Sequence, residues 1–238
     1  DLTRHAAIIL ASASIETATT LAALDLCADD VLFPTFSGSE IAHRIATQLE
    51  HKRVNDHLRA MVQEGFKAAV TDPLTGLYNR RYAMTHLCHQ FQRATQGQTD
   101  LALFVLDLDF FKRVNDTYGH AAGDQVLRRV AKLLQHVTRA SDMVARFGGE
   151  EFLVVLPDAS AAIAGNIAER VCTMIRRLKI GPNLIEITAS IGVSLRYNAA
   201  QTHVHLTAQE LLKQADRALY RAKAMGRDRV SYFAEQAA

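Results

Sequence analysis

Cysteine is scarce in this chain of 238 residues, and its spacing argues against a fold held by disulfides or by a zinc ion. The three cysteines, Cys27, Cys88 and Cys172, are odd in number and far apart, and no C-x-x-C pair occurs. Neither a disulfide framework nor a cysteine-rich zinc site is therefore indicated. Reduced thiols are typical of the cytosol, so we expect a cytoplasmic protein.

The sequence also lacks a long apolar run and a strong excess of either charge. No apolar segment reaches the length of a membrane span, and no secretory signal is recognisable. The formal net charge of +2 is too weak to indicate nucleic-acid or membrane binding. Because the chain starts at Asp1 and not at Met, we expect it to be a piece of a longer protein.

What the sequence does contain is an ordinary globular balance, 49% hydrophobic and 22% charged. Apolar runs predict strands at residues 6–11, 31–33, 101–108, 143–147, 151–156, 185–194 and 229–233, the first of them buried on both faces. Helical patterns cover residues 16–26, 38–70, 80–95, 123–138, 159–178 and 208–225. This mixture predicts an α/β (α+β) fold with a central sheet packed with helices.

The chain divides where Pro73 ends the long helical pattern. We assign a first segment to residues 1–50, a linker helix to 51–70 and the main domain to 71–238. Ser37, Gly38 and Ser39 give a capping signal for the long helix. Its apolar residues recur at three- to five-residue steps, which fits a solvated connecting helix or a short coiled coil that pairs two chains. The heptads are too few to decide.

Two carboxylates end the most apolar run of the main domain. Asp107 and Asp109 follow residues 101–106, and side chains at i and i+2 point to one face of a strand. Hard oxygen ligands placed in this way suit Mg²⁺, which also binds substrate phosphates. For an isolated D-x-D, a strand end that reaches solvent is the commoner explanation.

Gly148, Gly149, Glu150 and Glu151 lie between two predicted strands and indicate a tight hairpin turn. Glycines there let the backbone approach a ligand with its N–H groups facing phosphate. One of the acids would complete a metal site beside the Asp107 strand end. The alternative is a plain hairpin with solvated acids.

Two further sets of polar residues have both a binding and a structural explanation. Asn115 and Asp124 can read the polar edge of a purine, although capping and turn chemistry favour the same residues. Lys223 and Arg227, at i and i+4, would lie on one helix face and could meet phosphates. Complementation of the helix dipole is the commoner explanation for such a pair.

Taken together, these residues resemble the GGDEF family of diguanylate cyclases. The matching motifs are residues 72–81 (DPLTGLYNRR), 107–124, 148–152 (GGEEF), 188–194 (TASIGVS) and 215–230, all in the family's order and spacing from about residue 70 to 234. Glu150 stands where the family's name has Asp, which keeps the carboxylate. The resemblance implies a fold like the palm of nucleotide polymerases and class III nucleotidyl cyclases.

The resemblance also implies a role for each matching residue. Asp107, Glu150 and the carbonyl of Leu108 would bind Mg²⁺ (or Mn²⁺), and Glu150 would be the base for the 3′-hydroxyl. Asn115 and Asp124 would read guanine, with His120 nearby. Phosphates would be held by Phe110, Phe111, Lys112, Lys223 and Arg227, with Gly148 and Gly149 at the turn. Asp109 and Glu151 would be structural or secondary metal contacts. Arg139 and Asp142 match the family's R-x-x-D site for product inhibition. The alternative explanation is an ordinary Arg–Asp pair on the surface.

The implied reaction joins two molecules of GTP into cyclic di-GMP and releases two pyrophosphates. Each subunit holds one GTP, so a homodimer would be needed, with cyclic di-GMP as product and inhibitor. The alternatives are a catalytically silent receptor for GTP or cyclic di-GMP, and a related nucleotidyl transferase with another base preference. The retained Asp107, Glu150, Asn115 and Asp124 favour the active enzyme that uses guanine.

The first fifty residues resemble more faintly the C-terminal half of a response-regulator receiver domain. Residues 6–12 are similar to its fourth strand and residues 27–32 to the approach to its fifth. Phe33 stands before Pro34 where that family has Lys, and the phosphoacceptor Asp would precede residue 1. A degenerate dimerisation or adaptor module is therefore at least as well supported as phosphorylation control.

Overall fold

The computed structural model describes residues 6–11, 28–33, 35–197 and 206–233. The chain forms two compact units, residues 1–67 and 68–238. In the first unit, strands β1 (Ile9–Ala11) and β2 (Asp30–Leu32) pair in parallel as a two-stranded sheet. The helix predicted at residues 16–26 lies outside the described residues, as do Cys27 and Pro34.

The prediction that strand 6–11 is buried on both faces is wrong. The side chains of Ile8 and Leu10 are 43% and 37% exposed. In the described part of the chain β1 has β2 as its single sheet neighbour. A two-stranded sheet offers little surface against which to bury an apolar run.

Helix α2 (Gly38–Val70) confirms the long helical pattern. Its start is a capping box, because Glu40 accepts from the Ser37 N–H at 2.7 Å while Ser37 Oγ accepts from the Glu40 N–H at 3.3 Å. None of its residues is buried. The helix continues without a break past residue 50, so the division of residues 1–70 into a segment and a linker stays a prediction.

The second unit is built on a six-stranded sheet in the order β3-β5-β6-β4-β7-β8. The strands are β3 (Tyr78–Asn79), β4 (Leu101–Leu108), β5 (Met143–Arg146), β6 (Glu151–Pro157), β7 (Ala189–Arg196) and β8 (Val230–Tyr232). The pairs β3–β5 and β7–β8 are parallel, and the three central pairs are antiparallel. The predicted mixed α/β fold with a central sheet is confirmed.

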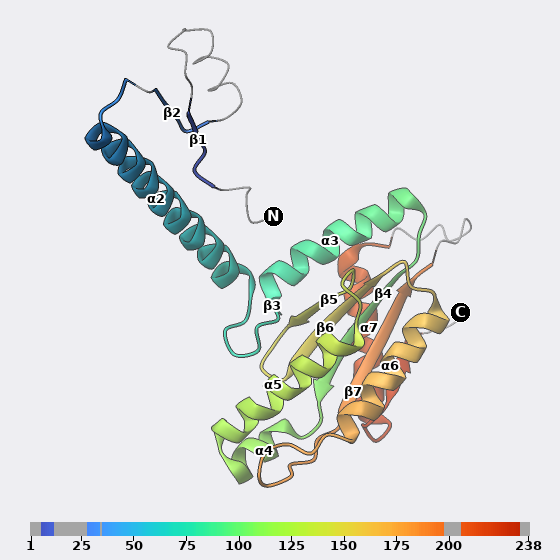
Figure 1. The fold of residues 1–238 in the computed structure, drawn as a ribbon. Coiled ribbons are helices and arrows are strands. Elements are labelled where there is room, and N and C mark those ends of the chain that lie inside the picture. Colours follow the sequence, from blue (N-terminus) through green and yellow to red (C-terminus); the bar gives the residue numbers. More distant parts are fainter. Residues whose placement is uncertain (1–5, 12–27, 34, 198–205, 234–238) are drawn as a thin grey trace. The chain divides into compact units, whose positions relative to one another are not determined.

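Helices cover both faces of this sheet (Figure 1). Helices α3 (Arg80–Gly97) and α7 (Ala208–Ala224) pack on one face, and α5 (His120–Val137) and α6 (Ala161–Arg176) on the other. Strand β4 is buried along its whole length. Its even-numbered residues pack with the α5 and α6 core, and Leu101, Leu103 and Val105 pack with the α3 and α7 core. By this alternation Asp107 falls on the face that α7 covers.

Helix α7 lies directly against β7 because Gly192 has no side chain. A Cβ atom at that position would come within 2.1 Å of the Ala215 carbonyl oxygen and 2.3 Å of the Leu219 nitrogen, both in α7. Any larger residue would therefore move the helix that carries Lys223.

Two short elements were not expected from the sequence, β3 and helix α4 (Phe111–Tyr118). The strand predicted at residues 185–194 begins only at Ala189, and Ile185 forms an isolated bridge with Ile180. None of the helices in the described ranges is long and apolar enough to cross a membrane.

Candidate active site

The C-terminal end of β4 carries a largely buried carboxylate that contacts a lysine of α7. Asp107 is 7% exposed, and its Oδ2 atom lies 2.8 Å from Lys223 Nζ. The Asp107 backbone lies opposite Glu151 of β6 and Ser190 of β7. A carboxylate in such a place is stabilised only by a cation or hydrogen-bond donors, and the ammonium group of Lys223 fulfils this requirement.

The hairpin between β5 and β6 brings a second acid to the same place. The predicted tight turn is present, with the Phe147 N–H donating to the Glu151 carbonyl at 2.8 Å. The Leu108 N–H donates to the Glu150 carbonyl at 3.3 Å, so Glu150 lies next to the end of β4. Burial raises the pKa of Glu150, and the Asp107 carboxylate raises it further, while Lys223 lowers it. Negative charge is therefore crowded at this strand end.

Asp109 has a different environment from Asp107. It is 3% exposed, and its carboxylate accepts from the Thr188 hydroxyl at 2.8 Å, the Ser190 hydroxyl at 2.7 Å and the Asp228 N–H at 3.0 Å. Three donors satisfy this carboxylate, which joins β4, β7 and the turn after α7. This environment fits the structural role considered for Asp109.

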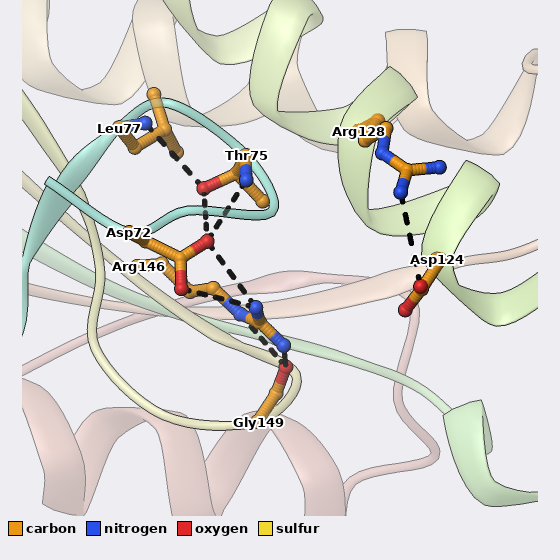
Figure 2. A network of polar contacts seen from close by, with 7 residues as sticks. All are labelled: Asp72, Thr75, Leu77, Asp124, Arg128, Arg146 and Gly149. Atoms are coloured by element: carbon orange, nitrogen blue, oxygen red, sulfur yellow. Dashed lines mark hydrogen bonds and ion pairs between the residues drawn. The ribbon is translucent and has the colours of Figure 1, made fainter. Parts of the chain in front are cut away.

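Helices α4 and α5 bring the two predicted guanine-reading residues close together. A Cβ atom on Gly123 would lie 2.0 Å from Asn115 Oδ1, so the Asn115 amide rests on α5 at that glycine, beside Asp124. Asp124 pairs with Arg128 at 3.8 Å (Figure 2). His120 is the exposed first residue of α5.

Three of the residues predicted to hold phosphate, Phe110, Phe111 and Lys112, lie at the start of α4. Phe110 precedes the helix with φ 56° and is 56% exposed, whereas the Phe111 side chain is 6% exposed. Phe111 could therefore meet a ligand only through its backbone. Lys112 is exposed in the first turn, where helix N–H groups favour anions.

Lys223 and Arg227 do not share a helix face as predicted, because α7 ends at Ala224. Arg227 lies in the turn that follows, with φ 63°. Its guanidinium group nevertheless stacks over the Phe110 ring, 4.6 Å from the centroid. The turn therefore brings Arg227 to the start of α4, while Lys223 reaches Asp107.

Sequence reasoning missed a polar network that joins the β5–β6 hairpin to Asp72 through Arg146 (Figure 2). Arg146 Nη1 lies 3.2 Å from both carboxylate oxygens of Asp72, and Arg146 Nη2 donates to the Gly149 carbonyl at 2.8 Å. Thr75 donates to Asp72 through its N–H and its hydroxyl, at 2.9 and 2.7 Å. Burial raises the pKa of Asp72, but these bonds outweigh burial and hold the pKa below its ordinary value. The DPLTG segment is thus tied to the turn that carries Glu150.

Arg139 and Asp142 form a tight turn after α5. The Arg139 N–H donates to Asp142 Oδ2 at 2.7 Å, and the Asp142 N–H donates to the Arg139 carbonyl at 3.0 Å. Both residues line a surface hollow of about 340 Å³, together with Tyr78 and Gln135. This hollow does not include the residues that surround Asp107.

Oxygen donors and the Lys223 ammonium group therefore meet at the C-terminal end of β4. In the described part of the chain no group of three or more His, Cys, Asp or Glu side chains is placed to hold a metal ion. The donors at hand are the carboxylates of Asp107 and Glu150 and backbone carbonyls. Such a set suits a hard divalent cation that takes its remaining ligands from water or substrate phosphates.

A model of the diguanylate cyclase GGDEF domain matches residues 69–229. The chain belongs to the GGDEF family of diguanylate cyclases. The response regulator PleD of Caulobacter vibrioides is 40% identical over 212 residues, which cover 87% of this chain and 46% of PleD. The chain thus spans about half the length of the curated relatives it matches.

Solved GGDEF structures support this family assignment. The coiled coil and GGDEF domain of DgcB from Caulobacter crescentus, in complex with c-di-GMP, matches with a TM-score of 0.69 and 32% identity. The match covers 82% of this chain and 99% of that one. An active GGEEF domain of a diguanylate cyclase from Vibrio cholerae matches with a TM-score of 0.62 and 31% identity, over 66% and 98% of the two chains. That active domain has Glu in the first of the two acidic positions, as this chain has at Glu150.

Proposed function

We propose that this chain is a diguanylate cyclase that condenses two GTP molecules into cyclic di-GMP and two pyrophosphates. The observation that carries the proposal is the meeting of Asp107, Glu150 and Lys223 at the end of β4. The 2.8 Å contact between Lys223 and Asp107 and the raised pKa of Glu150 support a site that binds cations and phosphates.

The two acids would hold divalent metal, Mg²⁺ or Mn²⁺, with the carbonyl of Leu108 as a further ligand. The fit rests on their chemistry, since all are hard oxygen donors, and on their proximity, since after burial the Asp107 carboxylate is the next cause that raises the pKa of Glu150. Bound metal would stabilise the charge that develops on the attacking and leaving oxygens.

Guanine would be recognised between α4 and α5. Asn115 offers an amide, and the Asp124 carboxylate can accept from the N–H groups of the base once it leaves Arg128. His120 lies at the start of the same helix. A chain without this pair of residues would lose its preference for guanine over adenine.

The triphosphate would lie along the start of α4, opposite the cationic side chains. The backbone of Phe110 and Phe111, with Lys112 and the glycines Gly148 and Gly149, would bind phosphate oxygens. Lys223 and Arg227 would bind the triphosphate of the substrate, and Lys223, beside Asp107, would also neutralise the charge on the departing pyrophosphate. Preorganised cations at this position act where charge increases in the transition state.

In each condensation the ribose 3′-oxygen of one GTP attacks the α-phosphorus of the other. Glu150 takes the 3′-hydroxyl proton, the new phosphodiester bond forms, and the bond to the β-phosphate oxygen breaks. Two such steps close the ring. Because each chain would hold one GTP, two chains must bring their sites together, and proximity would supply much of the rate.

The dimer would be favoured by α2, whose apolar residues are left without cover in the first unit. Its exposed large apolar side chains are Ile45, Leu49, Val54, Leu58, Met61, Val62 and Phe66. In the similar DgcB structure a coiled coil accompanies the GGDEF domain. A single polar substitution such as Leu58→Glu should therefore weaken dimerisation and turnover together.

Product inhibition would act through Arg139 and Asp142. Cyclic di-GMP is bound in a related structure, and the hollow beside these residues opens to the surface. The Arg139 guanidinium would pair with a phosphate of the product. We expect Arg139→Ala to leave initial rates unchanged and to remove the slowing as product accumulates; persistent slowing would count against this site.

The first unit would be related to a receiver domain. The match to PleD covers a larger share of the chain than residues 68–238 contain, so it extends into residues 1–67. PleD is named a response regulator, which supports the receiver-like resemblance. With GTP as substrate, we expect the reaction to take place in the cytoplasm.

The decisive assay is incubation of the dimeric chain, freed of bound nucleotide, with GTP and Mg²⁺. Cyclic di-GMP and pyrophosphate should appear in a ratio of about 1:2 from the two bond-forming steps. Glu150→Gln should abolish product while the circular dichroism spectrum stays unchanged. Binding of GTP or cyclic di-GMP without any turnover by the native chain would favour the silent receptor.

A further inference from the structure

The turn after α7 has an unusual backbone. Three successive residues, Gly226, Arg227 and Asp228, have φ values of 110°, 63° and 47°. Left-handed backbone is costly for residues with a side chain, and two such residues in a row persist only where their surroundings hold them. The contacts of Asp228 show what holds this turn.

Asp228 is held through its backbone and its side chain. Its N–H donates to Asp109 Oδ2 at 3.0 Å. Arg176, the last residue of α6, donates from Nε to Asp228 Oδ2 at 2.6 Å and from Nη2 to the Asp228 carbonyl at 3.2 Å. The Cys172 thiol, also on α6, lies 3.7 Å from Asp228 Oδ1. Helix α6 therefore binds both the side chain and the carbonyl of this residue.

The same turn determines where Arg227 points. Its guanidinium group lies 4.6 Å from the centroid of the Phe110 ring, and its carbonyl accepts from Arg229 Nε at 3.0 Å. Arg227 and Asp228 are adjacent, so a change in the backbone of Asp228 would redirect the Arg227 side chain. The Arg176 guanidinium bonds to Asp228 and Cys172, so it would act on Arg227 through Asp228.

We propose that Arg176 is a positioning residue for GTP binding: through Asp228 it holds the left-handed turn that presents Arg227 to the triphosphate. The inference rests on the proposed function, which assigns Arg227 to the phosphates. It adds a residue of α6, on the opposite face of the sheet from α7, to the determinants of substrate affinity.

The first test compares Arg176→Ala with Arg170→Ala in steady-state assays with GTP and Mg²⁺. Arg170 is a matched control, because it is also an exposed arginine of α6 that donates to a backbone carbonyl, that of Val137 at 2.8 Å. We expect Arg176→Ala to raise KM about five-fold with a smaller change in kcat. Arg170→Ala should leave both constants unchanged. Equal effects of the two variants would overturn the proposal.

Asp228→Asn separates the ion pair from the backbone strain. Asparagine adopts left-handed backbone readily and keeps the N–H that donates to Asp109, so this change weakens the contact with Arg176 without adding backbone strain to the turn. We expect the KM of this variant to rise as in Arg176→Ala, and the double variant to be no worse than either single one. Additive effects would show that the two residues act independently and would contradict the proposal.

Arg227→Ala distinguishes this inference from the proposed function. It should raise KM by more than Arg176→Ala does, and adding Arg176→Ala to it should have no further effect. If Arg227→Ala leaves KM unchanged, the phosphate role of Arg227 is wrong. If Arg227→Ala raises KM, and the double variant raises it further by the factor that Arg176→Ala causes alone, the role of Arg227 stands and the positioning role of Arg176 is wrong.

Discussion

Replacing Asp72 by asparagine tests the network that joins the DPLTG segment to the hairpin that carries Glu150. Both side chains of the Asp72–Arg146 pair are less than one fifth exposed, at 18% and 17%. The amide oxygen of an asparagine could still accept the two bonds from Thr75, so the change removes mainly the charge-assisted contacts with Arg146. Arg146 keeps its bonds to the Gly149 carbonyl and is not left without an acceptor. We therefore expect a loss of about 2 kcal/mol in the free energy of unfolding.

The loss should depend on pH in a direction fixed by the pKa of Asp72. That pKa lies below its ordinary value of 3.8. A carboxyl group with a depressed folded-state pKa contributes stability that is fully present above the unfolded pKa and is lost as pH falls through the folded pKa. The difference between native chain and Asp72→Asn should thus be full at about pH 7 and should shrink below about pH 3.8.

Urea unfolding followed by circular dichroism measures this difference, since the chain has no tryptophan for fluorescence. Lys213→Gln is a suitable control, because its pair with Glu210 spans 3.5 Å at an exposed position of α7. That change should have little effect at any pH. A difference for Asp72→Asn that is absent at neutral pH, or equally large at about pH 3, would refute the reasoning.

Three further predictions concern the close contacts of the site. Gly123→Ala should raise KM for GTP about ten-fold or more with little change in the far-ultraviolet spectrum, because the new methyl group displaces Asn115. Gly192→Ala should lower the melting temperature by several degrees, because its Cβ would meet the α7 backbone near Ala215. Glu150→Gln should raise the melting temperature of the metal-free chain and abolish the stabilisation by added Mg²⁺; stabilisation equal to that of the native chain would show that this residue does not bind the metal.

Regular apolar patterns made much of the fold predictable. The run at residues 101–106 predicted β4, and the Gly148–Gly149 pair between two apolar runs predicted the hairpin. Helix α4 was missed because Asn115 and Asp116, with Gly119 after them, fit turn chemistry equally well. It is stabilised by packing of Phe111 and Val114 against the core, which a local pattern does not show.

Contacts between residues far apart in the sequence could not be predicted from the spacing of residues within a segment. Asp72 and Arg146 are 74 residues apart, and no periodicity connects them. The separate roles of Asp107 and Asp109 also depend on tertiary neighbours, since one faces Lys223 and the other accepts from Thr188 and Ser190. The position of Arg227 follows from the left-handed turn after α7, which helical spacing does not predict.

The contact of Arg146 with the Gly149 carbonyl also fixes the orientation of a peptide plane. In a planar trans peptide the carbonyl oxygen and the following N–H point in opposite directions. With the Gly149 oxygen turned toward Arg146 at 2.8 Å, the Glu150 N–H is turned away from it. Without the guanidinium group the Gly149 carbonyl would lose the bonds from Arg146 Nε and Nη2. Arg146 thus sets the direction of a backbone donor at the tip of the hairpin.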